Sequence, residues 1–402
     1  MAFGALSDIR ILDLTQMLAG PFGTMMLADH GAEVIKIESP KGDMTRAGGP
    51  FPAEDQTRTH GGYFQSVNRN KKSVVLDLKT EAGRAAFLRL VESADAVTEN
   101  FRVGVMEKLG LGYETLRDVN PKLVYVALRG FGDPRTGRSP YADWPAFDVV
   151  AQAMGGIMGI TGDKGGRPTK IGPGVGDIIP GVMLAFGVLA GVHHARRTGL
   201  GQFIDVGMVD SVLSVCERMV YQHSIQGVVA EPEGDGHPFM CPFGMFPARD
   251  GFVTIAAPQQ PMFAQLCALI DAPELKDDPR FGSMADRGAH RADLLELLSA
   301  ATRRFTKAEL HARLGGVIPF GPVMRMDEIA ADPHFAAREM LAEIDQPGSA
   351  APVQVAGVPV KMTETPGRVA TRGPHLGEHT EQLLREAGVP EAEIQALRAT
   401  AA

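Results

Sequence analysis

Residues 9–37, IRILDLTQMLAGPFGTMMLADHGAEVIKI, carry the clearest indication of the fold class. Residues 9–14 form a short run rich in leucine and isoleucine, and residues 33–37 are apolar again. Between them, residues 21–30 have a helix-like composition that is closed by Gly31. This pattern predicts a strand, a helix and a second strand. Strands joined through a helix favour a parallel sheet with helices on both faces, since such crossovers are right-handed.

The same alternation continues along the first half of the chain. Residues 73–78 and 96–99 predict further strands, and residues 80–94 between them predict a helix for which Thr80 is a suitable N-cap. Residues 123–128 supply another strand. This half of the chain therefore predicts an α/β domain with a parallel sheet.

The character of the sequence changes at about Val228, where the turn-rich segment EPEGDG, residues 231–236, indicates a linker. Beyond it the patterns predict a smaller α+β domain, followed by extended and helical structure in the tail. The expected strands are residues 244–246 and 252–256, the expected helices are residues 260–270, 292–303 and 307–314, and the tail offers an extended stretch at 353–361 and an amphipathic helix at 380–387.

The composition is that of a folded globular protein. With 44% hydrophobic and 22% charged residues, the 402-residue chain is neither disordered nor fibrous. Its net charge of −8 argues against a nucleic-acid partner, because a phosphate backbone requires a sustained basic face. The most apolar stretch, residues 178–192, is too short to span a membrane, so we expect a buried helix and no membrane partner.

Three cysteines, Cys216, Cys241 and Cys267, show neither a disulfide framework nor the spacing of zinc ligands. We therefore expect a reducing compartment and no bound metal. The first eight residues lack an export signal. Together these features predict a cytoplasmic protein.

The first strand and helix invite comparison with dinucleotide-binding proteins. Glu38 follows Gly20 at nearly the spacing of a ribose-binding acid. However, the turn between the first strand and the helix, residues 18–23, reads LAGPFG. The G-x-G-x-x-G pattern is therefore absent, and Pro21 removes an amide that could bind pyrophosphate. We do not expect a nicotinamide or flavin site.

A more informative stretch is TGDKGGRPTKIGPGVGDIIPGVMLAFGVLAGVHHARRTGLG, residues 161–201. Its glycine-rich loop leads to Asp177, immediately before the apolar helix, with Pro180 expected in the first helical turn. Asp177 has two interpretations. It is either an N-cap that accepts amides of the first turn, or an ionised carboxylate available as a nucleophile at a helix N-terminus.

Several separated blocks, in this order, resemble the class III CoA-transferases, the CaiB/BaiF family. They are residues 11–46 (ILDLTQMLAGPFGTMMLADHGAEVIKIESPKGDMTR), 68–79 (NRNKKSVVLDLK), 99–132 (ENFRVGVMEKLGLGYETLRDVNPKLVYVALRGFG), the Asp177 loop and helix, 242–253 (PFGMFPARDGFV) and 374–388 (PHLGEHTEQLLREAG). The resemblance implies a Rossmann-like large α/β domain with a parallel sheet, residues 1–227 with 327–402. It also implies a smaller α+β domain, residues 228–326, and an interlocked homodimer.

By this resemblance, the protein is a CoA-transferase in which Asp177 attacks an acyl-CoA. The implied path runs through a mixed anhydride and an aspartyl-CoA thioester, after which the acceptor carboxylate reverses the steps. Coenzyme A is then a substrate, and no cofactor is bound permanently.

The resemblance also implies where CoA binds. Leu76 and Lys79 would border the adenine and Lys108 would face phosphate, whereas Arg102 departs from the small residue that the family has at its place. The implied CoA-binding residues are Leu18, Ala19, Leu76, Lys79, Asn100, Phe101, Arg102, Lys108, Leu128, Arg129, Gly130 and Phe131.

Two alternatives remain open. An α-methylacyl-CoA racemase resembles this chain but uses a histidine base where Phe147 stands here, and a phenyl ring transfers no proton. A non-catalytic acyl-CoA-binding protein is the other alternative.

For the transferase we expect a small, dicarboxylic acceptor and succinyl-CoA as donor. The basic residues available for a second carboxylate are Arg135, Arg138, Lys164, Arg167 and Lys170.

Overall fold

The computed structural model describes residues 4–237 and 239–401. The outermost limits of the expected domains, residues 1 and 402, lie outside this part of the chain. The described chain divides into two compact units: residues up to 157, 170–225 and from 333 onward form the first unit, and residues 158–169 with 226–332 form the second. The sequence places the domain boundaries at 227/228 and 326/327 and assigns residues 158–169 to the large domain.

The first unit is built on a six-stranded parallel sheet in the order β3-β2-β1-β4-β5-β6. This is the strand order of doubly wound Rossmann-like folds, so the predicted fold class is confirmed. The strands are β1 (Arg10–Asp13), β2 (Glu33–Glu38), β3 (Lys72–Val75), β4 (Ala96–Glu99), β5 (Val124–Arg129) and β6 (Phe203–Gly207).

Helices cover this sheet, and their ends follow local signals in the sequence. Helix α3 (Glu81–Val91) begins as expected at Thr80, whose side chain accepts a hydrogen bond from the Gly83 amide. The other helices of the first unit are α1 (Ala19–Asp29), α2 (Gly62–Asn68), α4 (Val105–Lys108), α5 (Tyr113–Val119), α6 (Asp148–Met154), α7 (Val175–Thr198), α8 (Met208–Ser214), α9 (Glu217–Gln226), which ends at the unit boundary, α15 (Pro333–Ala337), α16 (Thr380–Glu386) and α17 (Glu391–Ala401), with a short 3-10 turn at η1 (Met44–Ala47). A second 3-10 turn, η2 (Ile157–Ile160), begins at the unit boundary and lies mostly in the second unit.

Helices α1 and α7 pack unusually closely against each other. A Cβ atom added to Gly23 would lie 2.2 Å from the Gly181 carbonyl oxygen, and one added to Gly181 would lie 2.4 Å from the Ala19 carbonyl oxygen. Only glycine allows two helix backbones to approach to this distance. Gly23, which follows β1, therefore serves helix packing.

Three expectations about α7 are wrong. Asp177 is the third residue of the helix, which begins at Val175 with Gly174 as its N-cap, so Asp177 is not an N-cap. Pro180 lies inside the helix beyond its first turn. The apolar stretch is only half buried, and Phe186 is 70% exposed. By length and composition α7 could cross a membrane, which for a single half-buried helix is weak evidence.

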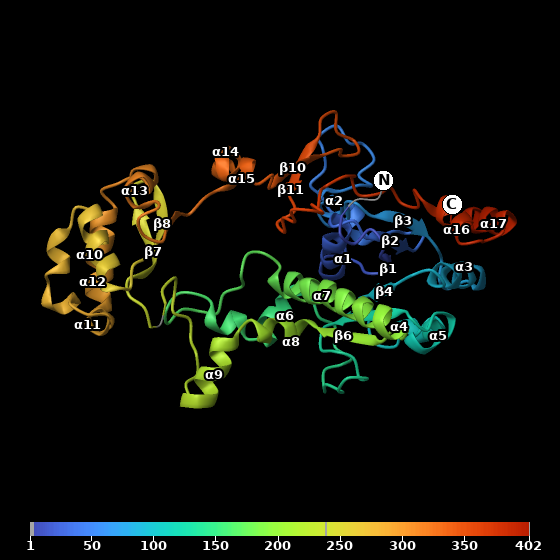
Figure 1. Ribbon diagram of the computed structural model, residues 1–402, viewed down its shortest axis with the longest axis horizontal. Coiled ribbons are helices and arrows are strands. Elements are labelled where there is room, and N and C mark those ends of the chain that lie inside the picture. Colours follow the sequence, from blue (N-terminus) through green and yellow to red (C-terminus); the bar gives the residue numbers. More distant parts are fainter. Residues whose placement is uncertain (1–3, 238, 402) are drawn as a thin grey trace. The chain divides into compact units, whose positions relative to one another are not determined.

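The C-terminal segment returns to the first unit. Figure 1 shows α16 and α17 beside β3 and α3, and the Thr380 hydroxyl accepts a hydrogen bond of 3.0 Å from the Val75 amide at the edge of the sheet. A two-stranded antiparallel ribbon, β10 (Leu341–Ile344) and β11 (Val353–Ala356), precedes these helices.

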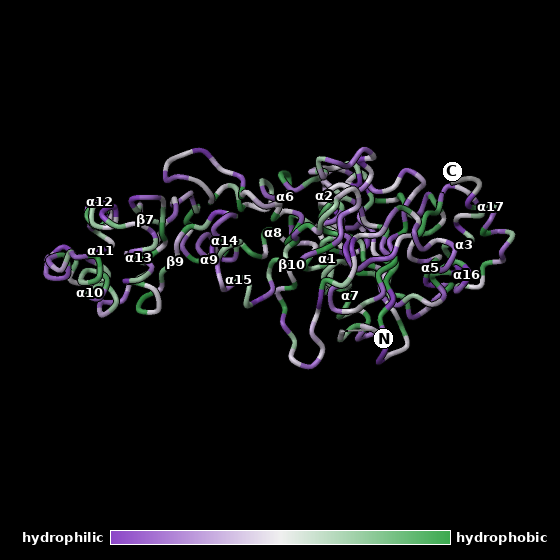
Figure 2. The backbone as a smooth tube through the Cα atoms, turned by 90° about the horizontal axis from the view of Figure 1, so that it is seen from above, coloured by the Kyte–Doolittle hydropathy of each residue, from purple (hydrophilic) through white to green (hydrophobic). Residues whose placement is uncertain are grey.

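The second unit has its own core, as expected for an α+β domain. The predicted strand pair is confirmed as β7 (Phe243–Ala248) and β8 (Gly251–Ala256), which are antiparallel and joined by β9 (Phe320–Pro322). Green and purple stretches alternate along its elements in Figure 2, as in helices with one buried face. Its helices are α10 (Gln260–Leu269), α11 (Met284–Ala289), α12 (Arg291–Thr302), α13 (Lys307–Leu314) and α14 (Met326–Ala331), with 3-10 turns η3 (Pro273–Lys276) and η4 (Pro279–Phe281).

Candidate active site

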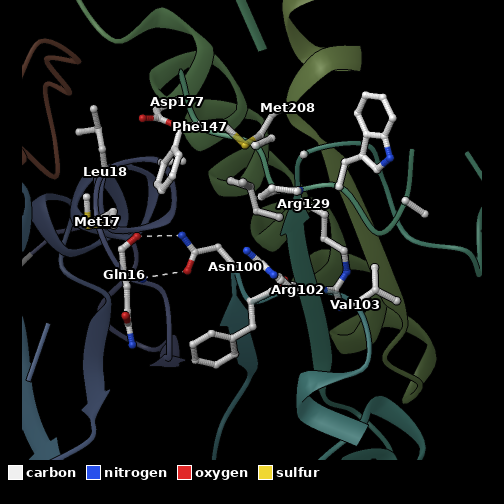
Figure 3. A pocket seen from close by; sticks show the side chains of 18 of the residues that line it. Gln16, Met17, Leu18, Asn100, Arg102, Val103, Arg129, Phe147, Asp177 and Met208 are labelled. Atoms are coloured by element: carbon white, nitrogen blue, oxygen red, sulfur yellow. Dashed lines mark hydrogen bonds between the residues drawn. The ribbon is translucent and has the colours of Figure 1, made fainter. Parts of the chain in front are cut away.

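A pocket of about 260 Å³ opens in the first unit at the carboxyl ends of β1, β4, β5 and β6 (Figure 3). Between β1 and β4 the strand order reverses, and in open α/β sheets such a switch point leaves a crevice that binds ligands. The lining residues are Gln16, Met17, Leu18, Ala19, Tyr63, Asn100, Phe101, Arg102, Val103, Leu128, Arg129, Gly130, Ala142, Asp143, Trp144, Pro145, Ala146, Phe147, Asp177 and Met208.

Asp177 reaches the pocket from the first turn of α7, and α6 fixes that turn. The Asp148 carboxylate accepts hydrogen bonds from the Gly176 amide at 2.9 Å and from the Gln152 side chain at 2.8 Å. A Cβ atom added to Gly176 would lie 2.4 Å from the Asp148 carbonyl oxygen, so glycine is required for this contact. The close approach of α6 brings the two carboxyl groups near each other.

Burial is the main reason why the pKa of Asp177 is raised from 3.8 to about 7. The negative charge of Asp148 raises the pKa further, and Lys170, whose ammonium lies 3.0 Å from the other Asp148 carboxylate oxygen, lowers it. Burial and the Asp148 charge thus outweigh the favourable position of Asp177 at the helix N-terminus in setting its pKa. A pKa of about 7 places the titration of Asp177 in the neutral pH range.

Apart from these electrostatic effects, the Asp177 carboxylate makes no direct polar contact with the described residues. Within residues 4–237 and 239–401 it accepts no hydrogen bond and forms no ion pair. Figure 3 shows the Phe147 ring on one side of the Asp177 carboxyl group and Leu18 on the other. A carboxylate among apolar groups and without donors is available to attack an electrophile once it is ionised.

The structure brings together most of the residues that were predicted to bind CoA. Those on the pocket wall are Leu18, Ala19, Asn100, Phe101, Arg102, Leu128, Arg129 and Gly130. The other four lie elsewhere. Leu76 is buried in the core, and Lys79 and Lys108 are exposed and do not line the pocket. Phe131 is buried and packs against Trp144 of the pocket wall, with 6.3 Å between the ring centroids.

The two arginines of the pocket differ in availability. The buried Arg129 guanidinium pairs with Glu99 at 2.8 Å and Asp133 at 2.9 Å, and it donates to the Phe101 carbonyl at 2.6 Å. The charge of Arg129 is therefore neutralised by ion pairs within the protein. The exposed Arg102 side chain has no such partner among the described residues, so it can meet an anionic ligand.

The basic residues that were predicted to meet a second carboxylate do not line the pocket. Arg135 pairs with Glu107 and Glu114, and Lys170 pairs with Asp148. Lys164 lies 3.9 Å from Glu233 in the second unit. Arg138 and Arg167 are exposed on loops.

Sequence reasoning did not assign roles to Asp148, Gln16, Trp144 or Met208. Two of these carry a signal that was available. Met208 directly follows β6, and Gln16 follows β1, and residues just past the carboxyl ends of parallel strands are where ligands bind. Among the described residues, no group of three His, Cys, Asp or Glu side chains is arranged to hold a metal ion.

Comparison with known proteins gives a consistent result. The sequence profile described as CoA-transferase family III matches residues 6–380. The chain is 49% identical over 387 residues to a succinyl-CoA:mesaconate CoA-transferase of Haloarcula hispanica, covering 96% of this chain and 97% of that protein. It is 38% identical over 388 residues to a succinate–glutarate CoA-transferase of Agrobacterium fabrum, covering 95% of each. A crystal structure of a CaiB/BaiF family protein from Brucella suis superimposes with a TM-score of 0.86 at 34% identity, covering 96% of this chain and all of that one.

Proposed function

The chain belongs to CoA-transferase family III, and on this basis we propose that it moves CoA from succinyl-CoA to a small dicarboxylic acid through a covalent intermediate on Asp177. The enzyme transfers CoA between acyl-CoA thioesters and carboxylic acids. The observation that carries the covalent route is the Asp177 carboxylate itself. It lies on the wall of the switch-point pocket, among apolar groups, with no described donor that would reduce its nucleophilicity.

The proposed reaction begins when the ionised Asp177 attacks the thioester carbonyl carbon of the donor. The carbon–sulfur bond breaks, CoA leaves as a thiolate, and an acyl-aspartyl anhydride remains. The thiolate then attacks the Asp177 carbonyl carbon, which releases the donor acid as a carboxylate and leaves an aspartyl-CoA thioester. The acceptor carboxylate repeats these two steps in reverse, so no water and no permanently bound cofactor or metal enters the balance.

The walls of the pocket suit an intermediate that water would destroy. Leu18, Phe147 and Met208 present apolar side chains around Asp177. These side chains reduce the access of water to the carboxyl group, in line with burial as the main cause of its raised pKa. The phenyl ring of Phe147 offers no proton transfer, in line with transfer of CoA instead of racemisation.

The substrate class is supported by the relatives and by charge. The relatives named above take succinate with mesaconate or glutarate, all of them short dicarboxylic acids. Arg102 is a cation on the pocket wall that is free to pair with an anionic group. A pocket of about 260 Å³ fits a short acid and the reactive end of CoA, with the rest of CoA extending outward.

We further propose a cytoplasmic homodimer with no nucleic-acid or membrane partner. Apolar side chains remain exposed on the first unit along α7 and along α9, and exposed apolar side chains in such numbers are typical of a surface that contacts another chain. They are Val182, Met183, Phe186, Leu189, Tyr221 and Ile225. Light scattering should give twice the chain mass, and a stable monomer would contradict the proposed dimer.

The covalent route is tested with Asp177→Ala. Purified enzyme is incubated with succinyl-CoA and, separately, mesaconate, glutarate, citramalate and a long-chain acid, and new thioesters are measured by mass spectrometry. The wild type should form thioesters of the short diacids, and the variant should form none. Trp144, the only tryptophan of the chain, lines the pocket, so its fluorescence reports whether the variant still binds succinyl-CoA. Near-normal turnover by Asp177→Ala would refute the route.

A further inference from the structure

The side chain of Asn100 joins two loops across the switch-point crevice. Its Nδ2 group donates to the Gln16 carbonyl at 2.8 Å, and its Oδ1 atom accepts from the Gln16 amide at 2.8 Å (dashed lines in Figure 3). Both backbone hydrogen-bonding groups of one residue are thus satisfied by one side chain. The amide of Asn100 replaces a neighbouring strand at this point.

This replacement is needed because the two strands part here. The ladder between β1 and β4 ends at Asp13 and Thr98, and one further bond of 2.8 Å joins the Leu14 amide to the Thr98 carbonyl. Beyond it the two chains diverge toward α1 and α4, so the Gln16 backbone has no strand to pair with.

Each of the two loops is anchored on its own side of the crevice. In the first loop, the Lys36 ammonium donates to the Thr15 carbonyl at 2.7 Å, and Asp13 accepts the Thr15 amide at 3.0 Å. In the second loop, Glu99 accepts the Phe101 amide at 2.7 Å, and Arg129 donates to the Phe101 carbonyl. Asn100 therefore connects two rigid supports, and its bonds set the separation between the loops.

The loop that Asn100 holds leads directly to the helix of the nucleophile. After Gln16, Met17 adopts a left-handed conformation with φ of 69°, which is unfavourable for a side chain of this kind and persists where neighbours enforce it. Leu18 then packs on the start of α7. A Cβ atom added to Gly174, the N-cap of that helix, would lie 3.0 Å from the Leu18 Cδ2 atom.

We propose that Asn100 is a positioning residue for the transfer reaction, which holds the Gln16–Leu18 wall against the first turn of α7 so that Asp177 stays oriented and shielded from water. This role rests on the proposed function of Asp177. Although Asn100 lies on the pocket wall, its amide is fully engaged with Gln16, so it acts through the loop and not through contact with the reacting atoms.

The test compares Asn100→Ala with Asn120→Ala. Asn120 is a matched control because its side chain also bonds only to the backbone, away from the pocket lining. Its Nδ2 group donates to the carbonyls of Val91 at 3.0 Å and Ala94 at 2.8 Å, and its Oδ1 atom accepts from the Lys122 amide at 3.1 Å. For each variant we would measure thermal unfolding, kcat and KM for succinyl-CoA, and the ratio of succinyl-CoA hydrolysis to CoA transfer.

Both variants should be less stable than the wild type, but only Asn100→Ala should lose about tenfold or more in kcat and show a several-fold higher hydrolysis ratio, since small misplacements of reacting groups are costly. Asn100→Asp provides a second, closer variant. It keeps an acceptor for the Gln16 amide but faces the Gln16 carbonyl with a carboxylate, so the same direction of change is expected.

Equal kcat and equal hydrolysis ratios for the Asn100 and Asn120 variants would overturn the positioning role. That outcome is distinct from failure of the proposed function, which would show itself as turnover by Asp177→Ala. If Asp177→Ala is inactive and the Asn100 variants have the kcat and the ratio of hydrolysis to transfer of the wild type, only the positioning role of Asn100 is refuted.

Discussion

Replacing Asp148 with asparagine isolates the effect of a like charge on the reactivity of Asp177. Asparagine keeps a side-chain oxygen for the Gly176 amide, so the start of α7 should remain in place. The substitution removes the negative charge that raises the pKa of Asp177, and it releases the Lys170 ammonium, which lowers that pKa. Both changes act in the same direction, and the pKa of Asp177 should fall below about 7.

The size of the rate increase expected for Asp148→Asn follows from the ionised fraction of Asp177. With a pKa of about 7, roughly one tenth of wild-type Asp177 is ionised at pH 6. The rate of the first half-reaction at this pH can therefore rise by at most about tenfold in Asp148→Asn. The rise should be smaller than this limit because burial, the larger cause of the shift, is unchanged. Above about pH 8 the wild-type carboxylate is already ionised, and no gain is expected.

The assay is kcat/KM for succinyl-CoA, followed as product thioester, between about pH 5.5 and 9. The wild-type profile should rise through a midpoint near the pKa of Asp177, about 7, and that of Asp148→Asn should rise at lower pH. Asp143→Asn is the control, because Asp143 is a carboxylate of the same pocket that is not among the causes of the shift. A midpoint for Asp148→Asn that stays in place, or that moves no further than that of Asp143→Asn, would refute the reasoning.

Two further predictions concern stability. In the folded protein the pKa of Asp177 lies at about 7, above its ordinary value of 3.8, so the folded state binds the proton more tightly and loses stability as the pH rises from about 4 to 7. Asp177→Asn should therefore unfold at a higher temperature than the wild type at pH 8, with a gain that vanishes near pH 4, and a gain independent of pH would contradict this cause. Gly23→Ala should destabilise the first unit by about 1–3 kcal/mol, because its Cβ atom would meet the Gly181 carbonyl oxygen at 2.2 Å. By contrast, Gly288→Ala in α11 should stabilise the protein by about 0.5–1 kcal/mol, because no atom lies within 4 Å of the added carbon. The free energy of unfolding of both variants is measured by denaturant unfolding. A Gly23→Ala variant more stable than Gly288→Ala would show that Gly23 is not needed for the helix contact.

Elements whose causes are local can be predicted from the amino-acid sequence alone. The alternation of apolar runs and helical segments predicted the parallel sheet, and Thr80 marked the start of α3 because a capping residue acts within one turn. The separated blocks of sequence predicted the family, which the comparisons confirmed. Asp177 is a candidate nucleophile in the sequence because it lies between the glycine-rich loop and the apolar helix, and in the structure it lies in the pocket.

The surroundings of Asp177 and the pairing of the neighbouring charged groups depend on contacts between distant parts of the chain. Asp148 and Asp177 influence each other because Gly176 lets α6 approach α7, and neither the contact nor the resulting pKa can be read from residues so far apart in the chain. Likewise, the sequence places Arg129 among the residues that bind a ligand, but its guanidinium forms ion pairs with Glu99 and Asp133. Chain neighbours determine capping and periodicity, whereas burial, charge pairing and the bridge from Asn100 to Gln16 depend on distances that exist only after the sheet has assembled.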